Sequence, residues 1–415
     1  MVLEIAFDCS FVDYPLVAVN ELDIREEMRP CWVENTWGED GLERVFDSIL
    51  ATGSRRVHFR SHCAGPWWPT KVPEAAPGSV ADPLNPSFRD WNPVEDAVRI
   101  GHSRGMKVIG WFDMTEGHAG IPTRWALSHP QFCIVNREGS RLDGPLRLVD
   151  RDGHPFDPGR HRTYSDFIEA GLMDGECERP DGTTIDPHLS LAFPEVIEYR
   201  IQLLRELLSF GVDGIYLTAN SCVGYEEPVV RRFEDKHGIS PFEVLPGDPR
   251  WISHQRGYFN EFIRKVQSLV EVSIDSEEGF EIALEGQGTG SGPMEPEPGW
   301  KRVPGWVKTP DFIDFGAIAS SGLVDTISLW SFREMDRLEA DLRGRVKIST
   351  RYRYMDDVFS REDYQKRISG AESRGVSMFV FNEPRVPLGK FEWLYRVKPG
   401  PIYDMATAWG RKIFV

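Results

Sequence analysis

The sequence has few cysteines, and no two of them have the spacing of a metal or redox site. Six cysteines are scattered over 415 residues without a Cys-x-x-Cys motif, which excludes the usual zinc-binding and thioredoxin-like patterns. In a chain of this size, dispersed cysteines favour reduced thiols over disulfides. The ten histidines are also dispersed and form no His-Glu-x-x-His motif. We therefore expect no bound metal and no other cofactor.

Long apolar runs and an excess of positive charge are also missing. No run approaches the roughly 20 apolar residues of a membrane span, and residues 1–8 lack the basic and apolar pattern of a signal peptide. Lysine and arginine total 48 against 65 aspartates and glutamates, a formal net charge of −17. This deficit argues against nucleic acid or an anionic membrane surface as a partner. We expect a cytoplasmic protein, and a homo-oligomer stays open.

What the sequence does contain is a repeated pattern of short apolar runs that end in polar or aromatic residues. Helical patterns separate most of these runs, and alternating strands and helices predict a parallel sheet. Eight such units predict an α/β fold, the (β/α)₈ TIM barrel, whose chemistry lies at the carboxyl ends of the strands. The predicted strands are 31–35, 57–62, 108–113, 214–218, 281–285, 326–330, 346–351 and 376–383.

The chain is expected to form one barrel domain preceded by a short extension. Residues 1–29 contain two alternating stretches, which predict an N-terminal β extension packed on the barrel, and residues 30–415 form the predicted catalytic barrel. Helices are expected at 41–50, 92–105 and 194–210, the second with Asn92 as N-cap and Pro93 at its first position. Long loops are expected at about 114–193 and 286–309.

Acidic residues stand near the ends of several predicted strands. Because side chains alternate along a strand, Asp113, Glu285 and Glu383 are expected to face the barrel mouth. Hydrolysis of a glycosidic bond needs two carboxyl groups, one to protonate the leaving oxygen and one to attack the sugar or activate water. We predict Glu285 as general acid/base, Asp113 as its partner and Glu383 as the reserve. The competing interpretation is that each acid pairs with a nearby arginine.

Aromatic and polar residues gather at the same strand ends. Aromatic rings can pack against the apolar faces of sugars, while a few converging polar groups bind the hydroxyls, as is typical of small-ligand pockets. Taken singly, each tryptophan is more often part of a core than a platform for a ligand. The residues predicted to contact a carbohydrate substrate are Arg60, His62, Trp68, Trp111, Tyr216, Thr218, Asn220, Trp330 and Arg351.

Several stretches carry a family resemblance. They include 105–113, which ends in Gly-Trp-Phe-Asp, 129–132 with 136–139, 191–196, 213–215, 231–238 and 311–315. Together they resemble the family-10-like glycosylhydrolases, barrel enzymes that include bacterial peptidoglycan glycosidases. The resemblance implies a TIM barrel that handles carbohydrate. One departure concerns the Asp-Gly-Ile run at 213–215, because the family usually keeps an inward aspartate shortly after it and this chain has Thr218.

These observations predict a glycoside hydrolase without a cofactor. Two alternatives stay open from the sequence. Thr218, where an acid is expected, favours a non-catalytic sugar-binding barrel, and the histidines near the predicted mouth would suit a metal-dependent lyase or isomerase. Fold alone does not decide among them, since barrels host many chemistries.

Overall fold

The computed structural model describes most of the barrel and the helices around it. The described residues are 4–9, 39–51, 54–62, 65–75, 91–115, 123–140, 147–149, 176–178, 184–185, 188–219, 222–274, 279–286, 312–329, 335–336, 338, 342–353 and 369–382. Among them, no helix combines the length and the apolarity that a membrane crossing requires.

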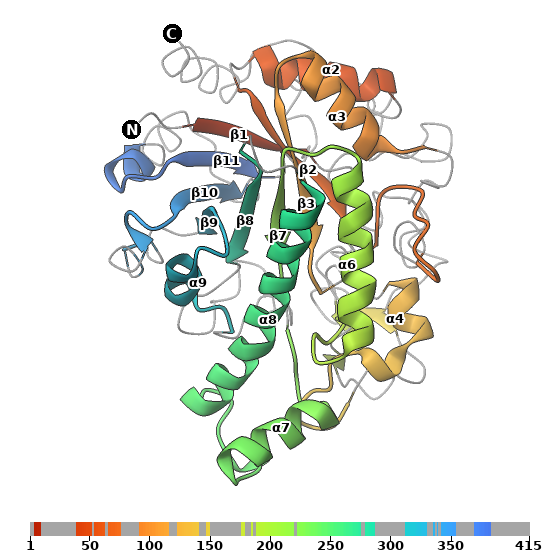
Figure 1. The fold of residues 1–415 in the computed structure, drawn as a ribbon, viewed down its shortest axis with the longest axis vertical. Helices are drawn as coiled ribbons and strands as arrows, with labels where there is room; N and C mark the ends of the chain where they lie inside the picture. The colour runs from red at the N-terminus through yellow and green to blue at the C-terminus, as the bar shows by residue number, and fades with distance from the viewer. Residues whose placement is uncertain are drawn as a thin grey trace.

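Eight parallel strands close into a barrel, in the spatial order β1-β11-β10-β9-β8-β7-β3-β2 (Figure 1). The (β/α)₈ fold expected from the sequence is therefore confirmed. The barrel strands are β1 (Glu4–Cys9), β2 (Arg56–His62), β3 (Lys107–Asp113), β7 (Gly214–Thr218), β8 (Glu281–Gly286), β9 (Thr326–Leu329), β10 (Lys347–Arg353) and β11 (Met378–Asn382). Seven of them match predicted runs to within two residues at each end.

The first barrel strand differs from the prediction. Glu4–Cys9, expected within an extension beside the barrel, pairs through its backbone with β11 on one side and β2 on the other. Alternation of polar and apolar residues fits a barrel strand as well as a surface strand, because a barrel interior can also be polar. The predicted strand 31–35 lies outside the described residues. The expected boundary at residue 29, between an extension and the barrel, otherwise stays a prediction.

All three expected helices are present. Helix α2 spans Glu39–Ala51, α3 spans Pro93–Ser103 and α6 spans Pro194–Ser209. Helices α3 and α6 begin at the prolines that the sequence signals indicate. Asn92 caps α3, because its side chain accepts a hydrogen bond from the Glu95 amide at 3.2 Å. Proline occupies the first turn of both α3 and α6, where no backbone donor is needed. Figure 1 shows α2 and α3 packed together at one end of the view.

The long segment after β3 contains secondary structure of its own. It includes α4 (Arg124–Ser128), the 3₁₀ helix η1 (Pro130–Phe132) and a small antiparallel sheet of β4 (Arg147–Val149), β5 (Glu176–Glu178) and β6 (Thr184–Ile185). Beyond β7 follow α7 (Glu227–His237), η3 (Pro241–Glu243), the long α8 (Pro249–Ser273) and, after β8, α9 (Phe315–Ser321). Helices α6 and α8 run side by side along the barrel (Figure 1).

The main hydrophobic core lies between the barrel and its helices. The outward faces of the strands supply buried residues such as Phe59, Phe112, Leu217 and Leu284, which belong to one cluster with apolar residues of α2, α3, α6 and α8. A separate, smaller cluster fills part of the barrel interior. Alternate residues along each strand thus serve two different environments, and the inward set is the one that concerns function.

Candidate functional site

The barrel interior holds a small aromatic and apolar layer. Ile109 and Trp111 of β3, Tyr216 of β7 and Ala283 of β8 form a cluster distinct from the main core. The rings of Trp111 and Tyr216 meet edge to face, with centroids 5.7 Å apart. Because this cluster identifies the inward face of three adjacent strands, it also identifies the residues two positions further on as inward-facing.

Below this layer, at the amino ends of the strands, a buried ion pair closes the floor of the barrel. Arg56 at the start of β2 donates to Glu281 at the start of β8, with Nη1 and Oε2 2.9 Å apart. The Thr326 hydroxyl donates to the other carboxylate oxygen at 2.7 Å. The Arg56 and Glu281 side chains are only 6% and 8% exposed. We interpret this group as structural, because barrel chemistry lies at the opposite end.

Asp113 lies at the carboxyl end of β3, on the same face as Trp111. It is buried, and its Oδ1 accepts a hydrogen bond from the Thr115 amide at 3.0 Å. Its backbone carbonyl accepts from the guanidinium of Arg200 on α6. The carboxylate is therefore fixed in orientation by its own strand end, as a positioned catalytic group requires.

Glu285 lies at a matching level on β8, with a completely buried side chain. Asp113 is in register with Thr218 of β7. Leu217 is in register with Leu284, so the next residues along these two strands are Thr218 and Glu285. Strands in a sheet are spaced about 4.8 Å apart, which puts the Cα atoms of Asp113 and Glu285 roughly 10 Å apart with one strand between them. The two predicted catalytic carboxyls thus belong to one inward level.

Thr218 stands between the two acids, and its hydroxyl accepts a hydrogen bond from the Trp111 indole at 3.1 Å. The guanidinium carbon of Arg60 lies 3.9 Å from the centroid of the Trp111 ring. The ring of His58 on β2 lies 4.9 Å from that of Tyr216. The structure therefore brings together Arg60, Trp111, Tyr216 and Thr218, four of the residues predicted to contact substrate.

His62 and Trp68 are not brought to this level. The register between β2 and β3 shifts between Arg60 and His62, and such an irregularity turns the following side chain to the other face. His62 contacts Phe112 and Trp68 in the outer layer, while Trp68 donates to Glu206 of α6 at 2.8 Å. Their places among core residues give the predicted contacts with substrate no support.

The other predicted site residues cannot be placed by their side chains. Glu383, Asn220 and Trp330 lie outside the described residues. Arg351 belongs to β10, where its backbone is in register with Val380 of β11. Their roles stay predictions.

Sequence reasoning missed Arg200, a buried cation within the helix layer. Its guanidinium donates to the Met114 carbonyl at 3.1 Å and to the carbonyl of Asp113. Its Nη1 lies 3.0 Å from Nε2 of His62. A signal was available, because Arg200 falls on the buried stripe of α6 between Val196 and Leu203, where an apolar residue is expected. Arg200 fixes the backbone that carries Asp113.

Glu226, just before α7, is a second buried charge that the sequence did not reveal. It is 2% exposed, and its carboxylate accepts hydrogen bonds from the Gly224 amide at 2.8 and 3.1 Å. Burial raises its pKa to about 7, although these hydrogen bonds act in the opposite direction. Because its oxygens bind amides of its own loop, we interpret Glu226 as a structural clamp at the base of α7.

The described residues contain no group of three or more histidine, cysteine, aspartate or glutamate side chains arranged to hold a metal ion. Asp113 and Glu285 have Thr218 between them rather than a third ligand. The inward level of the described strands thus presents carboxyl, hydroxyl, indole and guanidinium groups, a set suited to binding and proton transfer.

Comparison with known proteins supports the fold. No protein-family model matches the sequence, and no curated protein matches it. Among solved structures, the chain is similar to α-L-fucosidase isoenzyme 2 from Paenibacillus thiaminolyticus, with a TM-score of 0.57 and 9% identity, over 100% of this chain and 49% of that one. It is also similar to β-galactosidase from Bacillus circulans sp. alkalophilus, with a TM-score of 0.56 and 9% identity, over 100% of this chain and 56% of that one.

The chain therefore spans about half the length of each of these two proteins. At such low identity the similarity shows the shared fold: a barrel of the kind found in glycoside hydrolases. Residue roles do not transfer at this distance, since one barrel supports many functions.

Proposed function

We propose that this protein is a glycoside hydrolase with Asp113 and Glu285 as its catalytic carboxyl pair. One observation carries the proposal. Both residues lie on the inward face at the carboxyl ends of β3 and β8, with Thr218 between them and the Trp111–Tyr216 layer beneath. This is the end of a TIM barrel where active sites are built.

In this proposal, Glu285 donates a proton to the glycosidic oxygen and Asp113 supports the developing positive charge at the sugar carbon. The separation of the carboxyl oxygens would decide the stereochemistry, since retaining enzymes have about 5–5.5 Å and inverting enzymes about 6.5–9.5 Å. A backbone separation of roughly 10 Å, with both side chains directed inward, is compatible with either class. The hydrogen bond from the Thr115 amide would hold Asp113 in place throughout.

The proposed substrate is a carbohydrate. Trp111 and Tyr216 offer aromatic surface, Arg60 offers a donor above Trp111, and Thr218 offers a hydroxyl. Because the sequence resembles the family-10-like glycosylhydrolases, which include peptidoglycan glycosidases, bacterial cell-wall glycan is the first polymer to test. Glu383 stays in reserve for either carboxyl role.

The test is the substitution Glu285→Gln, which preserves size but cannot exchange a proton. With aryl glycosides and a panel of glycans, general acid/base catalysis predicts a loss of about 10²–10⁴-fold in kcat. Glu227→Gln, on the exposed face of α7, is the matched control and should retain full turnover. Wild-type turnover in the Glu285→Gln variant would exclude Glu285 from the chemistry.

A second candidate function rests on Thr218. This residue stands where the family that the sequence resembles usually keeps an aspartate, and its hydroxyl accepts a hydrogen bond from the Trp111 indole. A non-catalytic sugar-binding barrel would need no carboxylate there. Calorimetry that detects glycan binding, with no product released by the wild-type protein across the panel, would favour this function over hydrolysis.

A further inference from the structure

Two serines inside the barrel have buried hydroxyls without a hydrogen-bond partner. Ser328 on β9 and Ser349 on β10 are both completely buried, and neither Oγ has a hydrogen-bond partner within the part of the chain that the structure describes. A buried polar group left in this way costs about 1–3 kcal/mol. In native proteins such groups usually bind ordered water or have a functional role.

The two serines face the barrel interior. Thr326, two residues before Ser328, bonds to Glu281 in the floor of the barrel, whereas the neighbouring Ile327 belongs to the outer core. On β10, Ile348 also packs against the outer core. Side chains alternate along a strand, so the hydroxyls of Ser328 and Ser349 are on the inward side.

Both serines stand in one row with Glu285. Glu285 is in register with Ser328, and Ser328 is in register with Ser349. Adjacent strands are about 4.8 Å apart, so the Cα of Ser328 lies one strand from that of Glu285 and the Cα of Ser349 lies two strands away. Because neither hydroxyl is hydrogen-bonded to Glu285 or to any other described group, a link between the serines and the carboxyl group needs a bridging water.

We propose that Ser328 and Ser349 are positioning residues for Glu285, and that both hydroxyls act on its carboxyl group through a shared buried water. Such a water needs two to four polar partners, and the row supplies two hydroxyls and a carboxyl group. Only the expected effect on catalysis rests on the proposed function. The orientation and protonation of Glu285 can be tested without it.

The chemistry involves hydrogen bonds only. A water that donates to a carboxylate favours the ionised form. The water held by the serine row would also limit the rotation of the Glu285 side chain, which sets the direction of its proton transfer to the glycosidic oxygen. Loss of the row would favour the protonated form. The catalytic effect should fall mainly on kcat rather than KM, because the serines act through Glu285 and not on the substrate.

The experiment compares Ser328→Ala, Ser349→Ala and the double variant with Thr350→Val. Thr350 is the neighbour of Ser349 on the opposite face, and its hydroxyl donates to the Leu329 carbonyl at 3.0 Å. We expect Ser328→Ala to lower kcat about tenfold with little change in KM, and to move the basic limb of kcat/KM to higher pH by about one unit. Ser349→Ala should cause a smaller change in the same direction, and Ser328→Thr should restore the wild-type profile.

A second measurement needs no substrate. The carboxyl signal of Glu285 in pH-difference infrared spectra, assigned by its loss in Glu285→Gln, should shift to higher pH in both alanine variants but not in Thr350→Val. If Glu285→Gln retains turnover while this shift occurs, the proposed catalytic role of Glu285 fails and the positioning role stands. If the signal and the pH profile are unchanged in folded Ser328→Ala protein, the positioning role is wrong, whatever the outcome for hydrolysis.

Discussion

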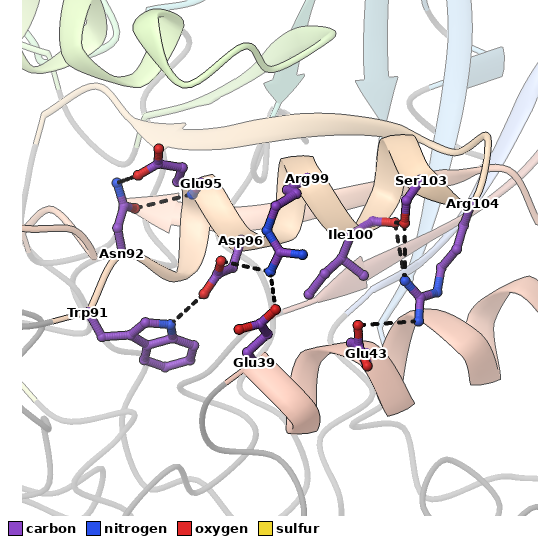
Figure 2. A network of polar contacts seen from close by, with 10 residues as sticks. All are labelled: Glu39, Glu43, Trp91, Asn92, Glu95, Asp96, Arg99, Ile100, Ser103 and Arg104. Carbon is purple, nitrogen blue, oxygen red and sulfur yellow. Dashed lines mark hydrogen bonds and ion pairs between the residues drawn. The ribbon is translucent and has the colours of Figure 1, made fainter.

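The barrel interior and the surface between α2 and α3 use the same kinds of polar residues in opposite environments. On the surface, Arg99 donates to Glu39 at 2.5 Å and to Asp96 at 3.0 Å, and Trp91 donates to Asp96 (Figure 2). The Arg99 side chain is 52% exposed. In the interior, Arg56 and Glu281 form a pair that is less than a tenth exposed.

This contrast shows that solvent access decides what a polar contact contributes. Exposed ion pairs exchange with water and contribute little. In Figure 2, the links from Arg99 to Glu39 and from Arg104 to Glu43 join two helices whose apolar faces already pack together. Buried charges cannot exchange their partner for water, so removal of one residue leaves the other charge buried and unpaired. The four predictions below test this difference, from the largest expected effect to the smallest.

The largest effect is expected at the floor of the barrel. Arg56→Met should lower the free energy of unfolding by about 3–5 kcal/mol, because Glu281 would stay buried without its cation. Urea denaturation at neutral pH measures this change. The double variant Arg56→Met/Glu281→Met should recover most of the loss, and equal losses in the single and double variants would contradict the account.

The next effect depends on pH and concerns Glu226. Its pKa of about 7 in the folded protein exceeds the ordinary value near 4.3, so the folded state holds a proton that the unfolded state releases. The stability contributed by Glu226 should therefore fall as pH rises from about 4.5 to about 7, by roughly 3 kcal/mol, and then level off.

Glu226→Gln should remove this pH dependence. The free energy of unfolding of the wild type minus that of the variant, measured by urea denaturation at several pH values, should decline across the same window. The exposed neighbour Glu227 is the control, since Glu227→Gln should leave the wild-type curve intact. A flat difference for Glu226→Gln would show that the carboxyl is not the buried clamp described here.

A smaller effect is expected at Thr218. Thr218→Val keeps the side-chain shape but removes the acceptor of the Trp111 indole, and should cost about 1–2 kcal/mol. Thr218→Ser retains the hydroxyl and should cost less. Thermal or urea unfolding of both variants measures the difference, and a valine variant as stable as the wild type would show that this hydrogen bond contributes nothing.

The smallest effect is expected on the surface. Hydrogen bonds to Asp96 and Glu39 raise the pKa of Arg99, but the residue is exposed to solvent. Arg99→Ala should leave the urea midpoint unchanged within error at physiological salt, with a slight decrease at low ionic strength. A loss as large as that of Arg56→Met would overturn the distinction between the two regions.

Much of the fold could be predicted because apolar runs and helix caps are local signals. Asn92 and Pro93 determine the start of α3 from adjacent residues alone. The first strand was not predicted because the apolar run at 31–35 lies directly before α2, whereas β1 ends at Cys9 and α2 begins only at Glu39. Alternation in Glu4–Cys9 carries no information about which sheet the strand joins, since pairing with β11 is a non-local property.

The site could be predicted in part for the same reason. Strand ends and alternation put Asp113, Glu285, Trp111 and Tyr216 on the inward face. They could not reveal the register shift that turns His62 outward, because such a shift depends on pairing between strands. Ser328 and Ser349 were missed because a serine within a strand has no pattern of its own. Their proximity to Glu285 depends on the register of β8, β9 and β10, which the sequence does not give.

The pairing of β1 with β11 has a consequence for synthesis of the protein. Ile5 pairs with Phe379, which lies 374 positions further along the chain, so the first strand cannot meet its second neighbour until that segment has been made. Contacts so distant along a chain form slowly, and an open strand edge is a template for association with other chains. Shielding of this edge by chaperones should therefore raise the yield of folded protein.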